Sequence, residues 1–245
     1  MLILLFFIAL IASFVFSLGG VGSAVILVPI LISLGIPVNA AKPIGLFNNT
    51  ISLVGASTSN IRQKRLDFNM GIPIIISSFL WAILGAYLSK FISIRFVLLL
   101  FIAFLLFSGS MFLFYKKKEQ ESYRNDIPYV KLILLGSFAG LLSGLLGIGG
   151  GTIISPLMLM LGFHPKKTAA ITAFVVPFSS FSAFLTYWAM GTVDWKILIV
   201  VSIAGVTGAT LGTMFMHNNL KPHIIKKILA VILLLMAIKL GLKLF

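Results

Sequence analysis

The stretch LGGVGSAVILVPILISLGIP at residues 18–37 decides the fold, because its glycines interrupt a long apolar run that would otherwise continue as one helix. A second stretch, LGIGGGTIISPLMLMLGFHP at residues 146–165, repeats the order of glycines, short apolar segment and proline. A shift of 127 residues places Gly20 on Gly147 and Pro29 on Pro156, and it continues without a gap to Asp67 and Asp194. The sequence therefore predicts two copies of one structural unit.

The composition predicts an all-α polytopic membrane protein. Hydrophobic residues make up 60% of the chain and charged residues 10%, and the mean hydropathy is +1.15. A soluble domain of this composition could not cover its surface with polar groups. Apolar runs of roughly 17–22 residues recur along the chain, which is close to the length that spans a bilayer. The period-two alternation of a membrane barrel is absent.

Ten apolar segments are expected to form helices. The second segment of each half is too short to span a membrane, since residues 151–162 would rise only ~18 Å. Each half is therefore a glycine-turned short-helix hairpin followed by three transmembrane helices, which gives eight to ten membrane segments in all. The first run is retained as structure because no basic region precedes it. The expected segments are 2–17, 22–35, 42–60, 70–89, 95–115, 130–146, 151–162, 168–190, 196–215 and 224–244.

The distribution of charge indicates how the segments cross the membrane. If all ten alternate sides, thirteen lysines and arginines lie on one side and six on the other. If each hairpin counts as one broken crossing, the split is eleven against eight, so the positive-inside rule favours the first count. The net charge of +14 is then explained by lipid-facing loops, and a nucleic-acid partner is not expected. Five passes per half give an inverted repeat, with a site between the halves near the midplane. The predicted units are a first repeat at 1–115, a cytoplasmic linker at 116–129 and a second repeat at 130–245.

The glycine turns are candidate anion-binding sites. A helix that starts at a glycine turn directs unpaired N–H groups and a partial positive charge at the turn, and glycine lets a ligand approach the backbone. The alternative is that these small residues only allow close helix packing. One predicted cradle consists of Gly19, Gly20, Gly22 and Ser23, and the other of Gly147, Gly149, Gly150, Gly151 and Thr152. All of these except Gly19 and Gly147 are predicted to bind substrate.

Polar side chains in the third segment of each half could complete this site. Asn48 and Asn49 fall in mid-span, where an amide needs a partner. Ser179 and Ser180 follow Pro177, which removes an N–H and frees an upstream carbonyl. We expect these four side chains to bind substrate, or alternatively to bond only between helices. Lys42 precedes Asn48 on the less basic side, where it could attract anions, although a snorkelling side chain is the simpler interpretation.

The apolar segments lack groups for acid–base or metal chemistry. All five carboxylates and all three histidines fall in loops or at segment edges, and the chain has no cysteine. Asp67 and Asp194 each precede a helix and are expected to cap it. No cofactor, metal or catalytic residue is predicted, so a membrane enzyme is the weakest interpretation. A transporter and a non-transporting membrane assembly subunit with an architectural repeat remain as the two alternatives.

The motif set resembles the sulfite exporter TauE/SafE family of membrane permeases. The resemblance rests on motifs that occur in two copies: the glycine turn, the short proline-containing helix that ends in LGIP or LGFHP, and an aspartate motif at the edge of a later segment, which is RLDF in the first copy and GTVDW in the second. This resemblance implies a secondary transporter for sulfur-containing anions such as sulfite, sulfoacetate or other organosulfonates in the bacterial plasma membrane. The expected partners are a small anionic substrate and membrane lipid, and the sequence sets no oligomeric state.

Overall fold

The protein is a bundle of helices. The computed structural model describes residues 1–17, 20–62, 66–114, 126–191, 193–219 and 222–244, and within these ranges the chain forms ten helices. They are α1 (Leu2–Ser17), α2 (Ala24–Ser33), α3 (Val38–Arg62), α4 (Phe68–Leu88), α5 (Ile94–Phe114), α6 (Tyr129–Leu146), α7 (Gly151–Met160), α8 (Pro165–Met190), α9 (Trp195–Asn219) and α10 (Pro222–Leu244).

The ten expected segments each correspond to one of these helices. Among the described residues, five helices are long and apolar enough to cross a membrane, namely α4, α6, α8, residues 95–114 of α5 and residues 195–215 of α9. Helices α2 and α7 have 10 residues each, so each rises about 15 Å, half of a hydrocarbon core. The prediction of a short second helix in each half is confirmed. Residues 116–125, which are most of the predicted linker, lie outside the described residues.

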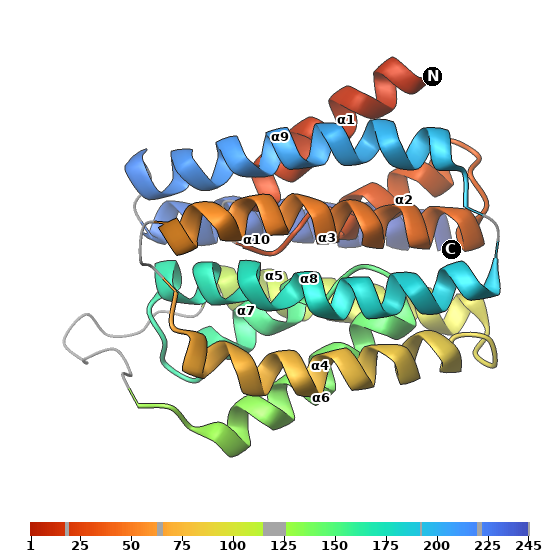
Figure 1. Ribbon diagram of the computed structural model, residues 1–245. Helices are drawn as coiled ribbons and strands as arrows, with labels where there is room; N and C mark the ends of the chain where they lie inside the picture. The colour runs from red at the N-terminus through yellow and green to blue at the C-terminus, as the bar shows by residue number, and fades with distance from the viewer. Residues whose placement is uncertain (18–19, 63–65, 115–125, 192, 220–221, 245) are drawn as a thin grey trace.

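The two helical hairpins enter the bundle from opposite ends (Figure 1). Helix α1 starts at the end where both chain termini lie, and α2 returns to that end. Helix α6 starts at the other end, and α7 returns there. Both glycine turns therefore lie within the length of the bundle, between its two ends.

The main helix contacts have a matching pattern in the two halves. Helix α1 packs on α9, and α6 packs on α4. Helix α3 packs on α8 and α9, α8 packs on α3 and α4, and α5 packs on α10. The repeat pairs α1 with α6, α3 with α8, α4 with α9 and α5 with α10. Under this exchange the α1–α9 contact becomes α6–α4 and the α3–α9 contact becomes α8–α4, while α3–α8 and α5–α10 are unchanged. Since the largest contacts join one half to the other, the two sequence repeats share their packing surfaces.

Prolines within the helices free carbonyls that serines of neighbouring helices satisfy. Pro177 in α8 cannot bond to Ala173 O, four residues earlier, and Ser57 Oγ of α3 donates to that oxygen over 2.8 Å. Pro156 in α7 frees Thr152 O, and Ser108 Oγ of α5 donates to it over 3.2 Å. A buried carbonyl without a partner is costly in an apolar interior, so these serines allow α7 and α8 to continue through their prolines.

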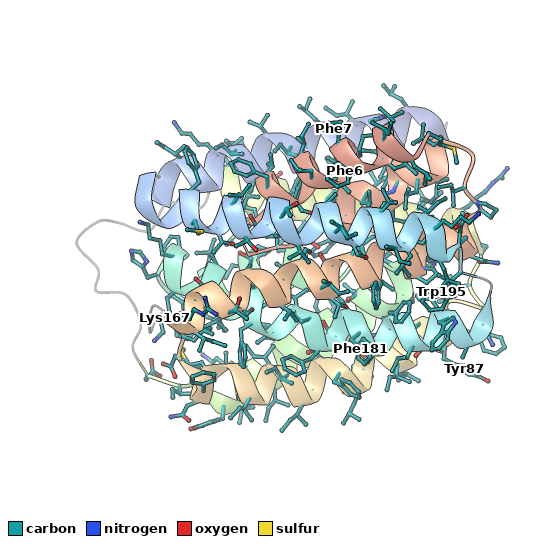
Figure 2. All side chains as sticks on the ribbon, turned by 45° about the horizontal axis from the view of Figure 1, so that its top comes forward. Phe6, Phe7, Tyr87, Lys167, Phe181 and Trp195 are labelled. Carbon is teal, nitrogen blue, oxygen red and sulfur yellow. The ribbon has the colours of Figure 1, made fainter. Side chains whose placement is uncertain are left out.

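Two ends of the bundle carry different side chains. Figure 2 shows Lys167 at one end, and Tyr87 and Trp195 at the opposite end. At the first end, Lys167 Nζ lies 3.1 Å from Asp67 Oδ2, so the start of α8 is paired with the start of α4. Asp67 occupies the N-cap position of α4 but accepts no hydrogen bond there. The expected capping bond is therefore wrong for Asp67, because its carboxylate faces Lys167.

Asp194, at the same place in the second repeat, does cap its helix. Its Oδ1 accepts from the backbone N–H groups of Lys196 over 3.0 Å and of Ile197 over 3.2 Å. We therefore expect Asp194→Ala to lower the free energy of unfolding by about 1 kcal/mol. Asp67→Ala should cost less, about 0–1 kcal/mol, because it removes one partly exposed ion pair. Denaturant unfolding of both variants in detergent measures the difference, and equal costs would contradict it.

Candidate functional site

The two glycine turns have the same backbone conformation. Gly20 and Gly22 have φ of 66° and 81°, and their repeat equivalents Gly147 and Gly149 have φ of 72° and 78°. These left-handed values favour glycine over any residue with a Cβ. Each turn is followed by a residue in right-handed conformation and then by a ten-residue helix. The repeat seen in the sequence is thus repeated in the local structure.

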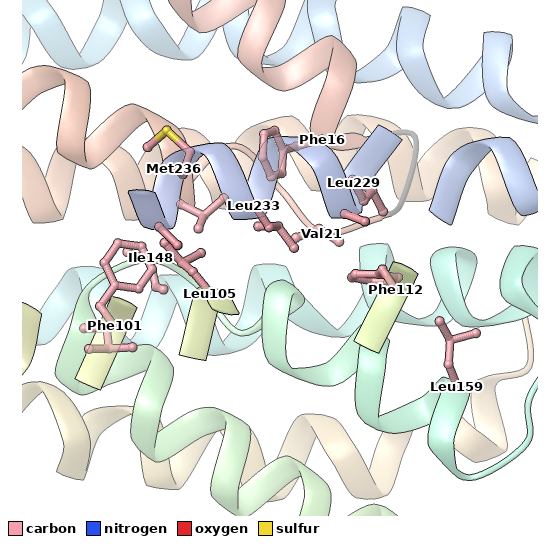
Figure 3. Close-up of a cluster of buried hydrophobic side chains, with 14 of the residues drawn as sticks. Phe16, Val21, Phe101, Leu105, Phe112, Ile148, Leu159, Leu229, Leu233 and Met236 are labelled. Atoms are coloured by element: carbon pink, nitrogen blue, oxygen red, sulfur yellow. The ribbon is translucent and has the colours of Figure 1, made fainter. Parts of the chain in front are cut away.

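The two turns touch in the interior of the protein. Gly151, the first residue of α7, packs against the carbonyl of Val21, so that a Cβ at this position would overlap the backbone of the first turn. The side chains of Val21 and Ile148, the central residues of the two Gly-x-Gly sequences, enter one buried apolar cluster formed with α5 and α10 (Figure 3). Both side chains are buried, since Val21 is 1% exposed and Ile148 is 2% exposed. The turns are therefore fixed next to each other by close packing.

Asn49 lies between the two turns. Its Oδ1 accepts from Ala24 N, the first N–H of α2, at 3.5 Å, and its Nδ2 donates to Ser180 Oγ of α8 at 2.9 Å. A Cβ on Gly22 would overlap Asn49 Oδ1, and one on Gly149 would overlap Asn49 Nδ2. The Asn49 amide thus contacts both turns and joins α2 and α3 to α8.

Asn48 faces a different set of partners. Its Nδ2 donates to Ser23 Oγ over 2.8 Å, and Ser13 Oγ of α1 donates to the same oxygen over 2.9 Å. Its Oδ1 packs against Gly205 of α9 and has no hydrogen-bond partner among the described residues. Asn48 therefore fixes the N-terminus of α2 to α3, and its amide oxygen remains free to accept a bond.

The second turn is surrounded by hydroxyl groups. Ser179 and Ser143 both lie against Gly150, the residue before α7. Ser179 Oγ donates to Val176 O over 3.1 Å, whereas Ser143 Oγ and Thr152 Oγ1 have no partner within the described part of the chain. Sequence reasoning missed Ser143, although its place four residues before Gly147 puts it on the last turn of α6. Two free hydroxyls therefore lie beside the N-terminus of α7.

Most of the residues predicted to bind substrate lie close together in the structure. All eleven are buried. Nine of them make the contacts around the two turns described above, and Thr152 directly follows Gly151 with a hydroxyl that has no partner among the described residues. Gly20 differs, since it packs on the backbone of Ala169 in α8, as the packing alternative expects. Gly19 lies outside the described residues. Among the described histidines and carboxylates, no group of three could hold a metal ion.

The local electrostatics combine two helix N-termini with neutral donors. Helices α2 and α7 both begin at this junction, and each N-terminus carries a partial positive charge of about half a unit. The described carboxylates Asp67, Asp126 and Asp194 all lie at helix ends or in connections. In this structure most polar groups at the α2 end bond one another, with Asn48 Oδ1 as the exception among the described residues, and those at the α7 end are partly unpaired. The arrangement is chemically suited to hold an anion by hydrogen bonds.

Lys42 does not snorkel, and this expectation is corrected. Its side chain is 6% exposed. The ammonium donates to Tyr187 Oη over 3.1 Å and to Leu145 O over 3.4 Å. Tyr187 Oη in turn donates to Gly144 O over 2.8 Å. Lys42 therefore points inward to the C-terminal carbonyls of α6, where a cation complements the helix dipole.

Comparison with known proteins gives a match over nearly the whole chain. A family model described as Sulfite exporter TauE/SafE matches residues 5–240. The chain is 28% identical to the Probable membrane transporter protein YunE of Bacillus subtilis over 264 aligned positions, which cover 97% of this chain and 96% of that protein. It is 26% identical to YdhB of the same organism, covering 92% of each. A 38% identity to Sulfite exporter TauE/SafE family protein 6 of Arabidopsis thaliana spans 107 residues, 43% of this chain and a quarter (25%) of that protein.

Proposed function

The chain belongs to the sulfite exporter TauE/SafE family, and on that premise we propose that it is a secondary permease for a small sulfur-containing oxyanion, such as sulfite or an organosulfonate. It is a multi-pass membrane protein by its family and its apolar helices. Its proposed location is the bacterial plasma membrane, with the more basic end of the bundle in the cytoplasm. The relatives matched over most of their length are named as probable membrane transporters.

The observation that carries this proposal is the contact of two glycine turns that each start a helix. The first N–H groups of α2 and α7 have no partner within their own helices, and both helices start beside Asn49. A tetrahedral or pyramidal oxyanion accepts several hydrogen bonds at once. The proposed shell consists of the backbone at Gly22 and Gly149 to Thr152, with side chains of Ser23, Asn48, Asn49, Ser179 and Ser180.

Entry of the anion requires the turns to separate. In the packed arrangement Asn49 Oδ1 occupies the acceptor position at the start of α2, so a bound oxyanion would replace it there. We propose that the two halves form an inverted repeat whose relative rocking opens this junction to one end of the bundle and then to the other. The matched contacts α1–α9 and α4–α6, and the self-paired contacts α3–α8 and α5–α10, support such a two-fold arrangement.

The proposal predicts measurable sulfite flux. Proteoliposomes that contain the purified chain should accumulate radiolabelled sulfite down its gradient faster than empty liposomes do. Sulfite and sulfoacetate should also raise the apparent melting temperature, because a ligand that binds only the native state stabilises it by about 2.7 kcal/mol at a hundred times its dissociation constant. Acetate is the matched control, since it carries a planar carboxylate instead of a sulfur oxyanion.

A specific result would favour the alternative of a non-transporting assembly subunit. If flux equals that of empty liposomes, and neither anion shifts the melting temperature, then the junction at Asn49 serves packing alone. This alternative would explain why Asn49 and close backbone packing fill the space between the two turns. A shift without flux would instead leave the anion site in place and remove the transport step.

A further inference from the structure

A cavity of about 490 Å³ opens at the less basic end of the bundle. Its wall is built from the start of α3, the connection between α4 and α5, the first turn of α5 and the end of α8. The polar part of the lining comes from Asn39, Lys42, Ser89, Lys90 and Tyr187. We call this cavity the vestibule. Two of its five polar side chains are cations, and none is an anion.

Lys42 is the innermost cation of the vestibule, and its charge has no counter-ion among the residues that the structure describes. Its two hydrogen-bond partners, Tyr187 Oη and Leu145 O, are neutral, and an ammonium group has a third donor. Asp194, which directly precedes α9, does not line the vestibule. A charge buried without an ion pair is costly in an apolar interior. A bound anion would supply the missing negative charge.

Lys42 also connects the vestibule to the glycine turns. Its aliphatic stem packs on Gly147, where an added Cβ would lie 2.7 Å from Lys42 Cγ and Cδ. Gly147 begins the turn whose next glycine, Gly149, touches Asn49 and Ser180. An anion that reaches the Lys42 ammonium is therefore one short turn of backbone away from the predicted shell. On the outer wall, Lys90 Nζ lies 5.5 Å from the ring centre of the exposed Tyr87.

The second repeat offers no equivalent cation. The residue that corresponds to Lys42 is Ala169, which packs with its backbone against Gly20. The otherwise matched turns thus differ at this position, so the two routes to the junction are electrostatically different.

We propose that the vestibule is a second oxyanion subsite, present at this end of the molecule only, in which Lys42 and Lys90 collect the anion before it reaches the glycine turns. Its role as an antechamber rests on the proposed transport function, whereas the binding of anions in it does not. The required chemistry is a sulfonate, sulfite or comparable oxyanion group. A lipid headgroup carries similar chemistry, and the experiment below separates the two sources.

The test uses the absence of cysteine from the chain. Ser89→Cys places a single thiol in the vestibule, and its rate of modification is measured in nanodiscs of phosphatidylcholine with two thiosulfonate reagents, one bearing a sulfonate and one a trimethylammonium group. The ratio of the anionic to the cationic rate reports the local potential. We expect Lys42→Met to lower this ratio about tenfold, because a cavity lined by one sign of charge concentrates the opposite ion. Lys196→Met, an exposed cation at the same end, is the matched control and should leave the ratio within about twofold.

Competition then identifies the occupant. Isethionate, a free sulfonate, should slow modification of the introduced thiol by neutral N-ethylmaleimide in the Ser89→Cys parent and have no effect once Lys42→Met is added. If Lys42→Met does not fold, Lys90→Met is a second variant, because the Lys90 side chain is exposed. We expect it to lower the ratio of the anionic to the cationic rate by less than Lys42→Met does. An unchanged ratio in the lysine variants, or protection by phosphatidylglycerol but not by isethionate, would overturn the proposal. Sulfite flux with no anion preference at the introduced thiol would leave the transport function intact and remove the vestibule subsite.

Discussion

Gly22→Ala is expected to abolish transport and to destabilise the protein by about 2–5 kcal/mol, the sum of a left-handed backbone strain and an overfilled contact. Gly22 has φ of 81°, and an added methyl group would overlap the amide oxygen of Asn49. The amide would have to leave the N-terminus of α2, so the proposed shell would be lost together with the packing. Sulfite flux in proteoliposomes and denaturant unfolding in detergent measure the two effects.

Gly35→Ala is the matched control, because it separates strain from overlap. Gly35 has a φ of 89°, close to that of Gly22, and a Cβ added there would meet no atom within 4 Å. We expect it to cost about 1–2 kcal/mol through backbone strain and to leave the flux of the folded protein unchanged. If the two glycine variants behave alike, then the contact with Asn49 has no functional role.

A double variant protects this test against simple misfolding. Adding Asn49→Ala to Gly22→Ala removes the overlapping amide, so part of the lost stability should return, with a coupling of about 0.5–3 kcal/mol between the two neighbouring sites. Transport should not return, because Asn49 is itself a member of the proposed shell. Recovery of both stability and flux would show that the glycine and the amide only need to avoid each other.

The helices were predictable because glycine, proline and long apolar runs mark their ends locally. Residues 2–17 and 151–160 are helical within or at the predicted limits, and the repeat offset that joins Gly22 to Gly149 predicted two turns of one conformation. Hydropathy alone could not show where the two glycine turns lie relative to each other. Their position depends on the contact of Val21 with Gly151, which joins the two halves.

The contents of the site were predictable and its bonding was not. Polarity in mid-span identified Asn49 and Ser180, but the repeat offset aligns Asn49 with Val176, so symmetry gives no reason to pair these two side chains. Lys42 shows the same limit. Its place near the start of α3 suggested a side chain directed to water, whereas the carbonyl that binds it comes from Leu145, 103 residues later. Local sequence does not encode which helix terminus will lie opposite a given side chain.

Asn49→Asp should lower the affinity for sulfite and organosulfonates by about two orders of magnitude, since placing like charges together costs several kcal/mol and each tenfold corresponds to about 1.4 kcal/mol. The substitution keeps the size of the side chain. Its carboxylate can still accept from Ala24 N at the start of α2, and Ser180 Oγ can donate to it in place of the present amide bond. A negative charge at a helix N-terminus is favourable, so the new carboxylate would occupy the position that the proposed substrate needs.

The two interpretations of Asn49 therefore predict different results for this variant. If the amide only joins helices, Asn49→Asp should retain anion-induced stabilisation and flux, because its hydrogen bonds can be replaced. If the junction binds anions, the thermal shift by sulfoacetate should disappear while the protein remains folded. A retained sulfoacetate shift in Asn49→Asp would exclude the contact of the two turns as the substrate site and would direct the search to the vestibule at Lys42.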